Sequence, residues 1–274
     1  MMPRTLCALA LVPLAACLHR EPLVGPPLAA PVEYGVAAVV ASGPRIGTSV
    51  YRLRVEHKRG DIWSVQTVHS EGSWEETGVV LSYDSDTPRS TDPWPILYQH
   101  ALSAVPAELR WLDGRPIGLV DEVDWKLKGL DALQGVTQVP AVGLESGKAL
   151  LDPSGFVRDM QRNFPGLPPE GAWIRSERVA GVDATLREQC TLEADALTRT
   201  WTCVGVIEAV PGGDATFVDV VVESTLIADS LGLRSFETAW SGAMQLADRP
   251  EHRAALRPVA GHRLVQRASG VATP

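Results

Sequence analysis

Two cysteines in the second half of the chain, Cys190 and Cys203, have the type and spacing that most directly indicate chemistry. Each lies in a stretch where apolar and polar residues alternate, which is typical of a strand with one buried face. If the stretches pair as an antiparallel hairpin with Cys190 opposite Cys203, further apolar pairs share that face: Leu192 with Trp201, and Leu186 with Ile207. We therefore predict a cross-strand disulfide in a hairpin that turns at residues 195–198. It would close a loop of about 14 residues, worth about 3 kcal/mol in the chain-entropy model.

The alternatives for this pair are a redox centre and a metal site, but the chain has no CxxC motif and no histidine near either cysteine. Nor do two histidines have the spacing of a helical metal-binding pair. The six histidines are His19, His57, His69, His100, His252 and His262. Each is interpreted as a surface or packed structural residue.

Other candidate motifs are incomplete. Residues 143–148 resemble half of a phosphate-binding loop, but Val142 and Ala149 replace the glycine and the hydroxyl residue that the motif needs. Asp84, Asp86 and Asp92 share a polar loop where calcium could bind, although their spacing fits no EF-hand and a solvated loop is the preferred interpretation. We predict no catalytic residue, no metal ligand and no cofactor, and the ligand-binding residues stay unknown.

The first seventeen residues have the pattern of a secretory signal peptide. Arg4 supplies a positive charge, residues 6–16 form an apolar run broken by Pro13, and Cys17 follows two alanines. The apolar run is shorter than the roughly 20 residues that span a bilayer core, so it indicates export rather than a membrane span. Export leads to an oxidising compartment, where the predicted disulfide would be stable.

The quartet Leu14-Ala15-Ala16-Cys17 resembles the lipobox of bacterial lipoproteins. That resemblance implies cleavage before Cys17, a diacylglycerol thioether on its sulfur, and acylation of its new amino group, with palmitate as the expected acyl chain. Two or more acyl chains hold a protein stably on a membrane. In enterobacterial lipoproteins an aspartate after the cysteine retains the protein at the inner membrane; Leu18 stands there in this chain, which implies the outer membrane. The alternative is an ordinary cleaved signal peptide in which Cys17 is incidental.

The composition predicts a folded domain that neither binds nucleic acid nor spans a membrane. With 274 residues, 45% of them hydrophobic, and eight tryptophans, the chain can form a packed core. A net charge of −8 and the lack of a basic cluster argue against nucleic acid as a partner. No second apolar stretch has the length of a membrane span. The predicted partners are the membrane, through the lipid anchor, and a lipid or a protein.

Proline and glycine divide the chain into segments. Four prolines between residues 18 and 32 predict an extended tether, and the sequence PGLPPEG at 165–171 is the clearest internal boundary. The predicted segments are the signal peptide 1–16, the lipidated cysteine and tether 17–32, a sheet-plus-helices region 33–164, the Pro/Gly crossover 165–171, an antiparallel sheet region 172–268 and a flexible tail 269–274. Whether the two strand-rich regions are one domain, two domains or a duplication stays open.

Hydrophobic periodicity predicts strands towards both ends of the chain and helices between them. Period two over 50–83 indicates an antiparallel meander with turns at 59–61 and 71–73. Helices are predicted at 93–105, 121–133 and 152–164, with a hairpin that turns at Asp113-Gly114. Further strands are predicted at 172–180, 184–193, 199–210, 215–228, 232–247 and 255–267. The element order predicts an α+β fold with antiparallel β-sheets, arranged as meanders, packed on two or three short helices.

In this element order the mature chain is similar to the periplasmic lipoprotein carriers, whose half-barrel holds acyl chains. That resemblance implies a half-barrel-like sheet around an apolar hollow. The stretch Leu109–Leu133 followed by Phe164–Pro168 also looks like uncharacterised bacterial lipoproteins of duplicated sheet-and-helix build. Six tryptophans lie on apolar faces, where they would fill a core or line such a hollow: Trp63, Trp111, Trp125, Trp173, Trp201 and Trp240.

We therefore expect a non-catalytic envelope lipoprotein that binds an apolar ligand or a protein partner. One alternative is a purely structural outer-membrane scaffold. The other is an envelope hydrolase, for which the sequence shows no combination of nucleophile and base.

Overall fold

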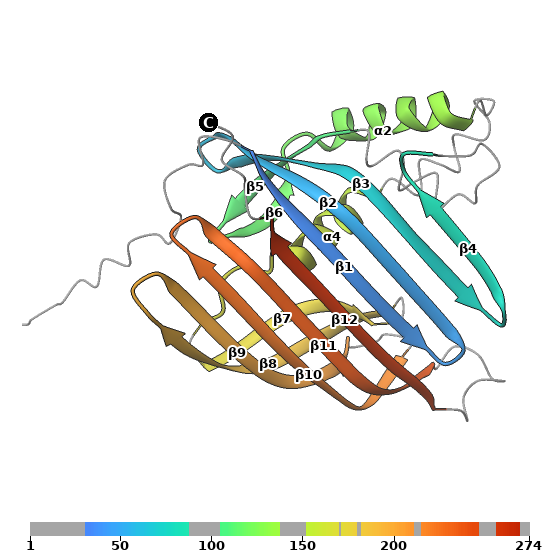
Figure 1. Ribbon diagram of the computed structural model, residues 1–274, viewed down its shortest axis with the longest axis vertical. Coiled ribbons are helices and arrows are strands. Elements are labelled where there is room, and N and C mark those ends of the chain that lie inside the picture. The colour runs from blue at the N-terminus through green and yellow to red at the C-terminus, as the bar shows by residue number, and fades with distance from the viewer. Residues whose placement is uncertain are drawn as a thin grey trace, which may run out of the picture.

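The structure is a computed structural model that describes residues 31–87, 105–137, 152–169, 171–179, 182–210, 215–246 and 256–268. The described part contains twelve strands and two short helices (Figure 1). The strands are β1 (Val32–Ser42), β2 (Arg45–Arg59), β3 (Ile62–Glu76), β4 (Val79–Asp84), β5 (Ala107–Leu112), β6 (Arg115–Leu119), β7 (Gly171–Val179), β8 (Val182–Ala194), β9 (Thr198–Ala209), β10 (Ala215–Asp229), β11 (Gly232–Leu246) and β12 (Arg257–Arg267). The helices are α2 (Glu122–Thr137) and α4 (Pro153–Asn163).

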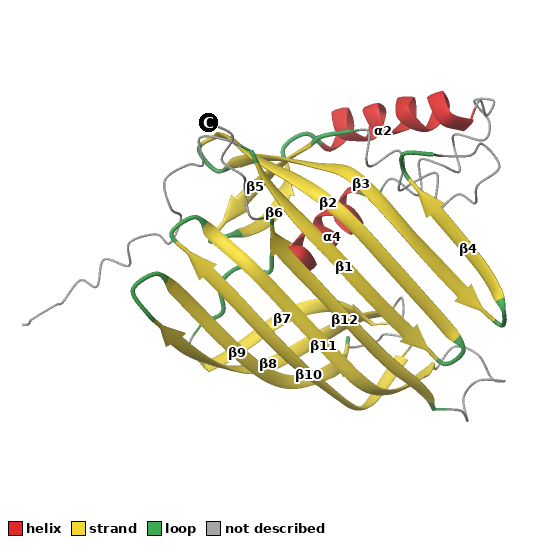
Figure 2. Ribbon diagram, in the orientation of Figure 1, coloured by secondary structure: helices red, strands yellow, loops and turns green. Residues whose placement is uncertain are grey.

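The fold is largely β, which corrects the expected α+β class. The antiparallel pairing and the short helices are confirmed, but strands dominate the described chain (Figure 2). The reason is the length of the period-two runs, since β2, β3, β10 and β11 each continue for 15 residues. Neither described helix is both long and apolar enough to cross a bilayer.

All twelve strands belong to one antiparallel sheet. Its order is β6-β5-β3-β2-β1-β12-β11-β10-β9-β8-β7, and β4 pairs with β3 beside this path. The pairing of β1 with β12 joins the strands before and after the Pro/Gly crossover into one continuous sheet. Helix α4 contacts both β6 and β7, which are the two ends of the strand order. The open sheet therefore curves so that both of its ends reach one helix, and Figure 1 shows α4 behind β1 and β2.

The register of β8 and β9 confirms the predicted disulfide. Cys190 pairs with Cys203 in a bridge whose Cα atoms lie 4.1 Å apart. The predicted flanking pairs are also found, Leu186 with Ile207 and Leu192 with Trp201. The backbone N–H of Asp195 donates to the carbonyl of Thr198, which closes the hairpin where the sequence predicted its turn.

The buried residues form two clusters on one side of the sheet, which we call the inner face. The first cluster packs around α4 and includes Tyr34, Leu53 and Phe236. The second contains Trp240 and Met244 of β11, towards the other end of that strand. Because side chains alternate between the faces of a strand, Phe236, Trp240 and Met244 can all point inward from one predicted apolar face.

Most predicted boundaries in the described part hold, with two exceptions: no strand was predicted before residue 50, where β1 and the start of β2 lie, and one turn was misplaced. The hairpin turning at Asp113-Gly114 is confirmed, and so are the helices near 121–133 and 152–164. The turn predicted at 71–73 is wrong, because β3 continues to Glu76 and the chain turns at Thr77 and Gly78, both with positive φ. Gly72 lies within the strand, where an added Cβ would come within 2.7 Å of the Tyr83 ring. The helix predicted at 93–105 lies almost entirely outside the described residues.

Candidate ligand-binding site on the inner face

Helix α4 begins at a local signal that the sequence predicted. The Asp152 side chain accepts a hydrogen bond from the backbone N–H two residues later, at 3.0 Å, and Pro153 is the first helical residue. Phe156, Met160 and Phe164 are spaced four residues apart and share one side of the helix. All three are buried, which confirms the predicted apolar side.

Aromatic side chains surround the apolar side of α4. The Phe164 ring lies 5.1 Å from the rings of both Tyr34 in β1 and Trp111 in β5. The Phe156 ring lies 5.0 Å from Trp125 of α2. Ring contacts at this separation add specific attraction to the burial of apolar area. Five of the six tryptophans singled out in the sequence pack in this cluster, namely Trp63, Trp111, Trp125, Trp173 and Trp201, whereas Trp240 belongs to the second cluster.

The last turn of α4 carries polar contacts to the sheet. The Gln161 side chain donates to the Pro116 carbonyl at 2.9 Å and accepts from Arg115 at 3.3 Å. The Asn163 carbonyl oxygen accepts a hydrogen bond from the Tyr51 hydroxyl at 3.1 Å. Burial raises the pKa of Tyr51 to about 12, so its hydroxyl keeps its proton at neutral pH.

Six buried side-chain nitrogen atoms in the described residues have no hydrogen-bond acceptor. They are Nε1 of Trp111, Trp125 and Trp240, Nε of Arg115 and Arg162, and Nδ2 of Asn163. Arg162 Nε lies 3.6 Å from the Glu177 carboxylate, which satisfies it in part. All six are N–H donors, and all except Trp240 lie on α4 or in residues beside it. A buried donor without a hydrogen bond lowers stability by about 1–3 kcal/mol. A bound molecule could provide the acceptors that these groups lack.

A buried network of charges crosses the inner face between the two apolar clusters. Arg175 of β7 bonds the Glu188 carboxylate at 2.7 and 3.3 Å and lies 3.3 Å from Glu177. Arg263 of β12 donates to both Glu177 oxygens at 3.1 Å. Ser224 and Thr238 complete the network with hydroxyl groups. Because its charges are paired, this network can remain buried without a ligand.

The charges of this network shift the acidity of Glu177. Burial alone raises the pKa of this carboxyl group, but the attraction of Arg263 and Arg175, a backbone N–H and Arg162 outweigh burial. The pKa of Glu177 is therefore held below its ordinary value, and the group is a carboxylate at neutral pH.

Sequence reasoning missed this network, although a signal was present. Arg175 and Glu177 occupy inward positions of an alternating strand between Trp173 and Val179. Glu188 occupies the same kind of position in β8. A charged residue within an apolar face is costly unless it is paired, so such positions predict partners on neighbouring strands.

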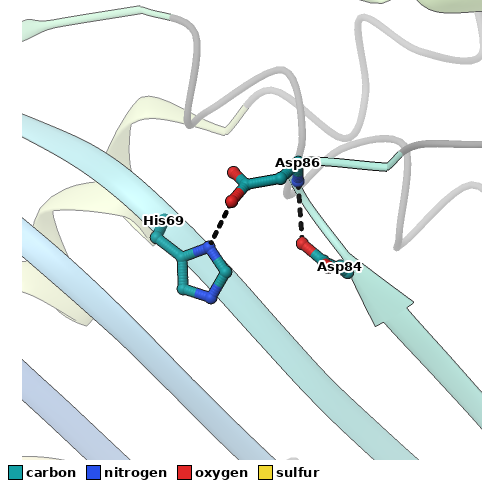
Figure 3. Close-up of side chains that lie close together, drawn as sticks. All are labelled: His69, Asp84 and Asp86. Carbon is teal, nitrogen blue, oxygen red and sulfur yellow. Dashed lines mark hydrogen bonds and ion pairs between the residues drawn. The ribbon is translucent and has the colours of Figure 1, made fainter.

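A separate cluster of potential metal ligands lies beside β4. One ligand atom from each of His69, Asp84 and Asp86 lies within 4.8 Å of the others. His69 Nδ1 lies 3.1 Å from an Asp86 oxygen, and the Asp86 backbone N–H donates to the Asp84 side chain (Figure 3). The sequence placed the aspartates in one polar loop but did not place His69 beside them, because His69 comes from the neighbouring strand β3. Imidazole and carboxylate can bind divalent metals, although these groups also satisfy one another by hydrogen bonds.

Several residues singled out in the sequence lie outside the described part, namely Cys17, His19, Asp92, His100 and His252. His57 bonds the Gly60 carbonyl at 3.0 Å, and His262 lies 2.7 Å from Glu237. The structure does not bring these two histidines together with His69 in any cluster among the described residues.

The fold defines a class of largely β proteins in which one open, curved sheet packs on a helix. No protein-family model and no curated protein matches the chain. A solved structure of lipovitellin, described for its lipid–protein interactions, is similar to it with a TM-score of 0.50 and 8% sequence identity. The match covers 86% of this chain but 25% of the lipovitellin chain, so the chain spans about a quarter of that protein's length. At this identity the likeness concerns the fold alone.

Proposed function

We propose that this chain is a lipid-anchored protein of a bacterial envelope that binds an apolar ligand beside α4 on the inner face of the sheet. The observation that carries the proposal is the composition of this face, where an aromatic cluster packs beside buried donors that lack acceptors. Ligand sites in proteins are mostly apolar and contain a few convergent polar groups. The fold-level likeness to a lipovitellin structure described for lipid–protein interactions is compatible with this function.

The proposal of a lipid anchor is based on the resemblance of residues 14–17 to a lipobox. In cells fed radiolabelled palmitate, we expect the wild-type chain to carry label and to sediment with membranes. Cys17→Ser should abolish the label and release the chain, because the acylated thiol is lost. Cys7→Ser is the matched control, since it removes another cysteine of the same N-terminal segment, and it should behave as wild type. Label that persists in Cys17→Ser would contradict the anchor.

Ligand binding is tested on the full-length chain carrying Cys17→Ser, expressed with its own signal peptide so that no acyl anchor obscures the result. Native mass spectrometry should show an added mass that disappears after solvent extraction. The extracted molecule then names the class of ligand. If the protein shows no added mass and also fails to bind a panel of acyl lipids, the proposed apolar ligand is excluded. A protein partner or a scaffold role would then remain.

A further inference from the structure

Arg115 differs from the other arginines that face the inner core. It begins β6 directly after the Asp113-Gly114 turn and is half-buried beside α4. Its hydrogen-bond partner among the described residues is the neutral amide of Gln161, at 3.3 Å. Arg162, Arg175, Arg263 and Arg267 instead each pair with at least one carboxylate. Among the described residues, no carboxylate oxygen thus lies within 4 Å of a nitrogen of the Arg115 guanidinium. Its Nε also lacks a hydrogen-bond acceptor.

Two neutral donors without acceptors lie in the same region. Trp111 is on the strand that pairs with β6 and contacts Phe164, the residue after α4. Asn163, the last residue of α4, is 1% exposed and uses its oxygen for Tyr51 while its Nδ2 has no partner. A cation and two N–H donors without acceptors are the groups that a carboxylate or phosphate would bind.

We propose that the ligand is an amphiphile with an anionic head, which binds Arg115, Trp111 Nε1 and Asn163 Nδ2 at the C-terminal end of α4. The inference rests on the proposed function, since the acyl chain would pack against the aromatic cluster beside α4. The shared chemistry of the head is an oxyanion, found in a fatty-acid carboxylate and in a phospholipid phosphate. The helix end carries about half a negative charge, which opposes an anion, but the full charge of Arg115 outweighs it.

The test measures dissociation constants with the full-length Cys17→Ser chain. The probes are palmitate, hexadecanol as its uncharged match, dodecyl phosphate and inorganic phosphate. We expect palmitate or dodecyl phosphate to bind at least about tenfold more tightly than hexadecanol, since hydrogen bonds to charged groups contribute about 1.5–3 kcal/mol. The head that shows this preference identifies the source of the oxyanion.

Arg115→Gln should reduce the preference for the anionic probe over hexadecanol to about twofold or less, because it removes the charge and keeps amide donors. Arg110→Gln is the matched control, since Arg110 lies on the neighbouring strand, is exposed and also lacks a carboxylate partner among the described residues. It should leave the preference unchanged. If Arg115→Gln does not fold, Trp111→Phe keeps the ring and removes one donor, and it should weaken the binding of the acid but not that of the alcohol.

The outcomes separate this inference from the proposed function. Equal binding of hexadecanol and the anionic probes, with or without Arg115, would overturn the inference and leave the apolar ligand site standing. Binding of inorganic phosphate alone would overturn the inference because the anion would then need no acyl chain. A chain that binds none of the amphiphiles would reject the proposed function as well.

Discussion

Replacement of Glu177 by glutamine is expected to lower the free energy of unfolding by about 3–5 kcal/mol. The Glu177 side chain is fully buried and its carboxylate contacts Arg175, Arg263 and Arg162. Glutamine has nearly the same shape but no charge, so it leaves guanidinium groups buried beside a neutral amide. The cost arises mainly from these uncompensated cations rather than from the lost attraction.

Urea denaturation followed by tryptophan fluorescence at pH 7 measures this change. Glu208→Gln is the control, because Glu208 pairs with Arg187 in the same sheet while both side chains are about half exposed. An exposed pair contributes about 0–1 kcal/mol. If the two variants lose equal stability, the buried network does not have the energetic role that we assign to it.

The ionisation of Glu177 also makes the stability of the fold depend on pH. The pKa of Glu177 in the folded chain is below the ordinary glutamate value, so the folded state favours the carboxylate over the acid. Its contribution is therefore present above the unfolded pKa of about 4.3 and is lost as the pH falls through the lower folded pKa. Wild type should lose stability over this acid range, and Glu177→Gln should lose less because it has no proton to bind at this position.

Replacement of Phe236 by alanine is expected to lower the free energy of unfolding by a similar amount, about 3–5 kcal/mol. Phe236 is 0% exposed and lies between Leu226 and Val265 on the neighbouring strands. The Arg175 guanidinium also lies over its ring, 5.2 Å from the centroid. Alanine would leave a cavity between three strands and remove the ring from a buried cation.

The same denaturation experiment tests Phe236, with Leu231→Ala as its control. Leu231 is large and apolar but exposed in the turn between β10 and β11. A surface substitution of this kind changes stability by about 0.5 kcal/mol or less. A loss below about 1.5 kcal/mol for Phe236→Ala would mean that the inner face collapses around the deletion and is less tightly packed than the contacts indicate.

Local patterns in the sequence were sufficient for most individual strands. β11 shows why, because its apolar residues alternate over the whole strand and the register of its neighbours follows from which face is buried. The bridge between Cys190 and Cys203 was predictable for the same reason, since the flanking apolar pairs and the turn agree with one register. The apolar side of α4 followed from its 3.6-residue period and its N-cap at Asp152.

β1 was harder to predict from its sequence. Residues 36–40 are all apolar, so the strand has no period-two pattern, although its inner side carries Tyr34 and Val36. This strand decides the architecture, because its pairing with β12 joins segments more than 200 residues apart in the chain. Such a pairing depends on how the whole sheet curves and not on a local preference of either strand.

The sequence by itself therefore determined most strands other than β1, the disulfide and the apolar side of α4, since each depends on the period of a short segment. Only the tertiary structure decided which polar residues meet. Arg175, Glu177, Glu188 and Arg263 each interrupt an apolar face, and they become compatible with burial because the sheet brings them together. Arg115 shows the opposite case, because among the described residues its neighbours beside α4 provide an amide and no carboxylate. Burial without a charged partner is a property of the folded arrangement, and it leaves a cation available to an anionic ligand at this end of the helix.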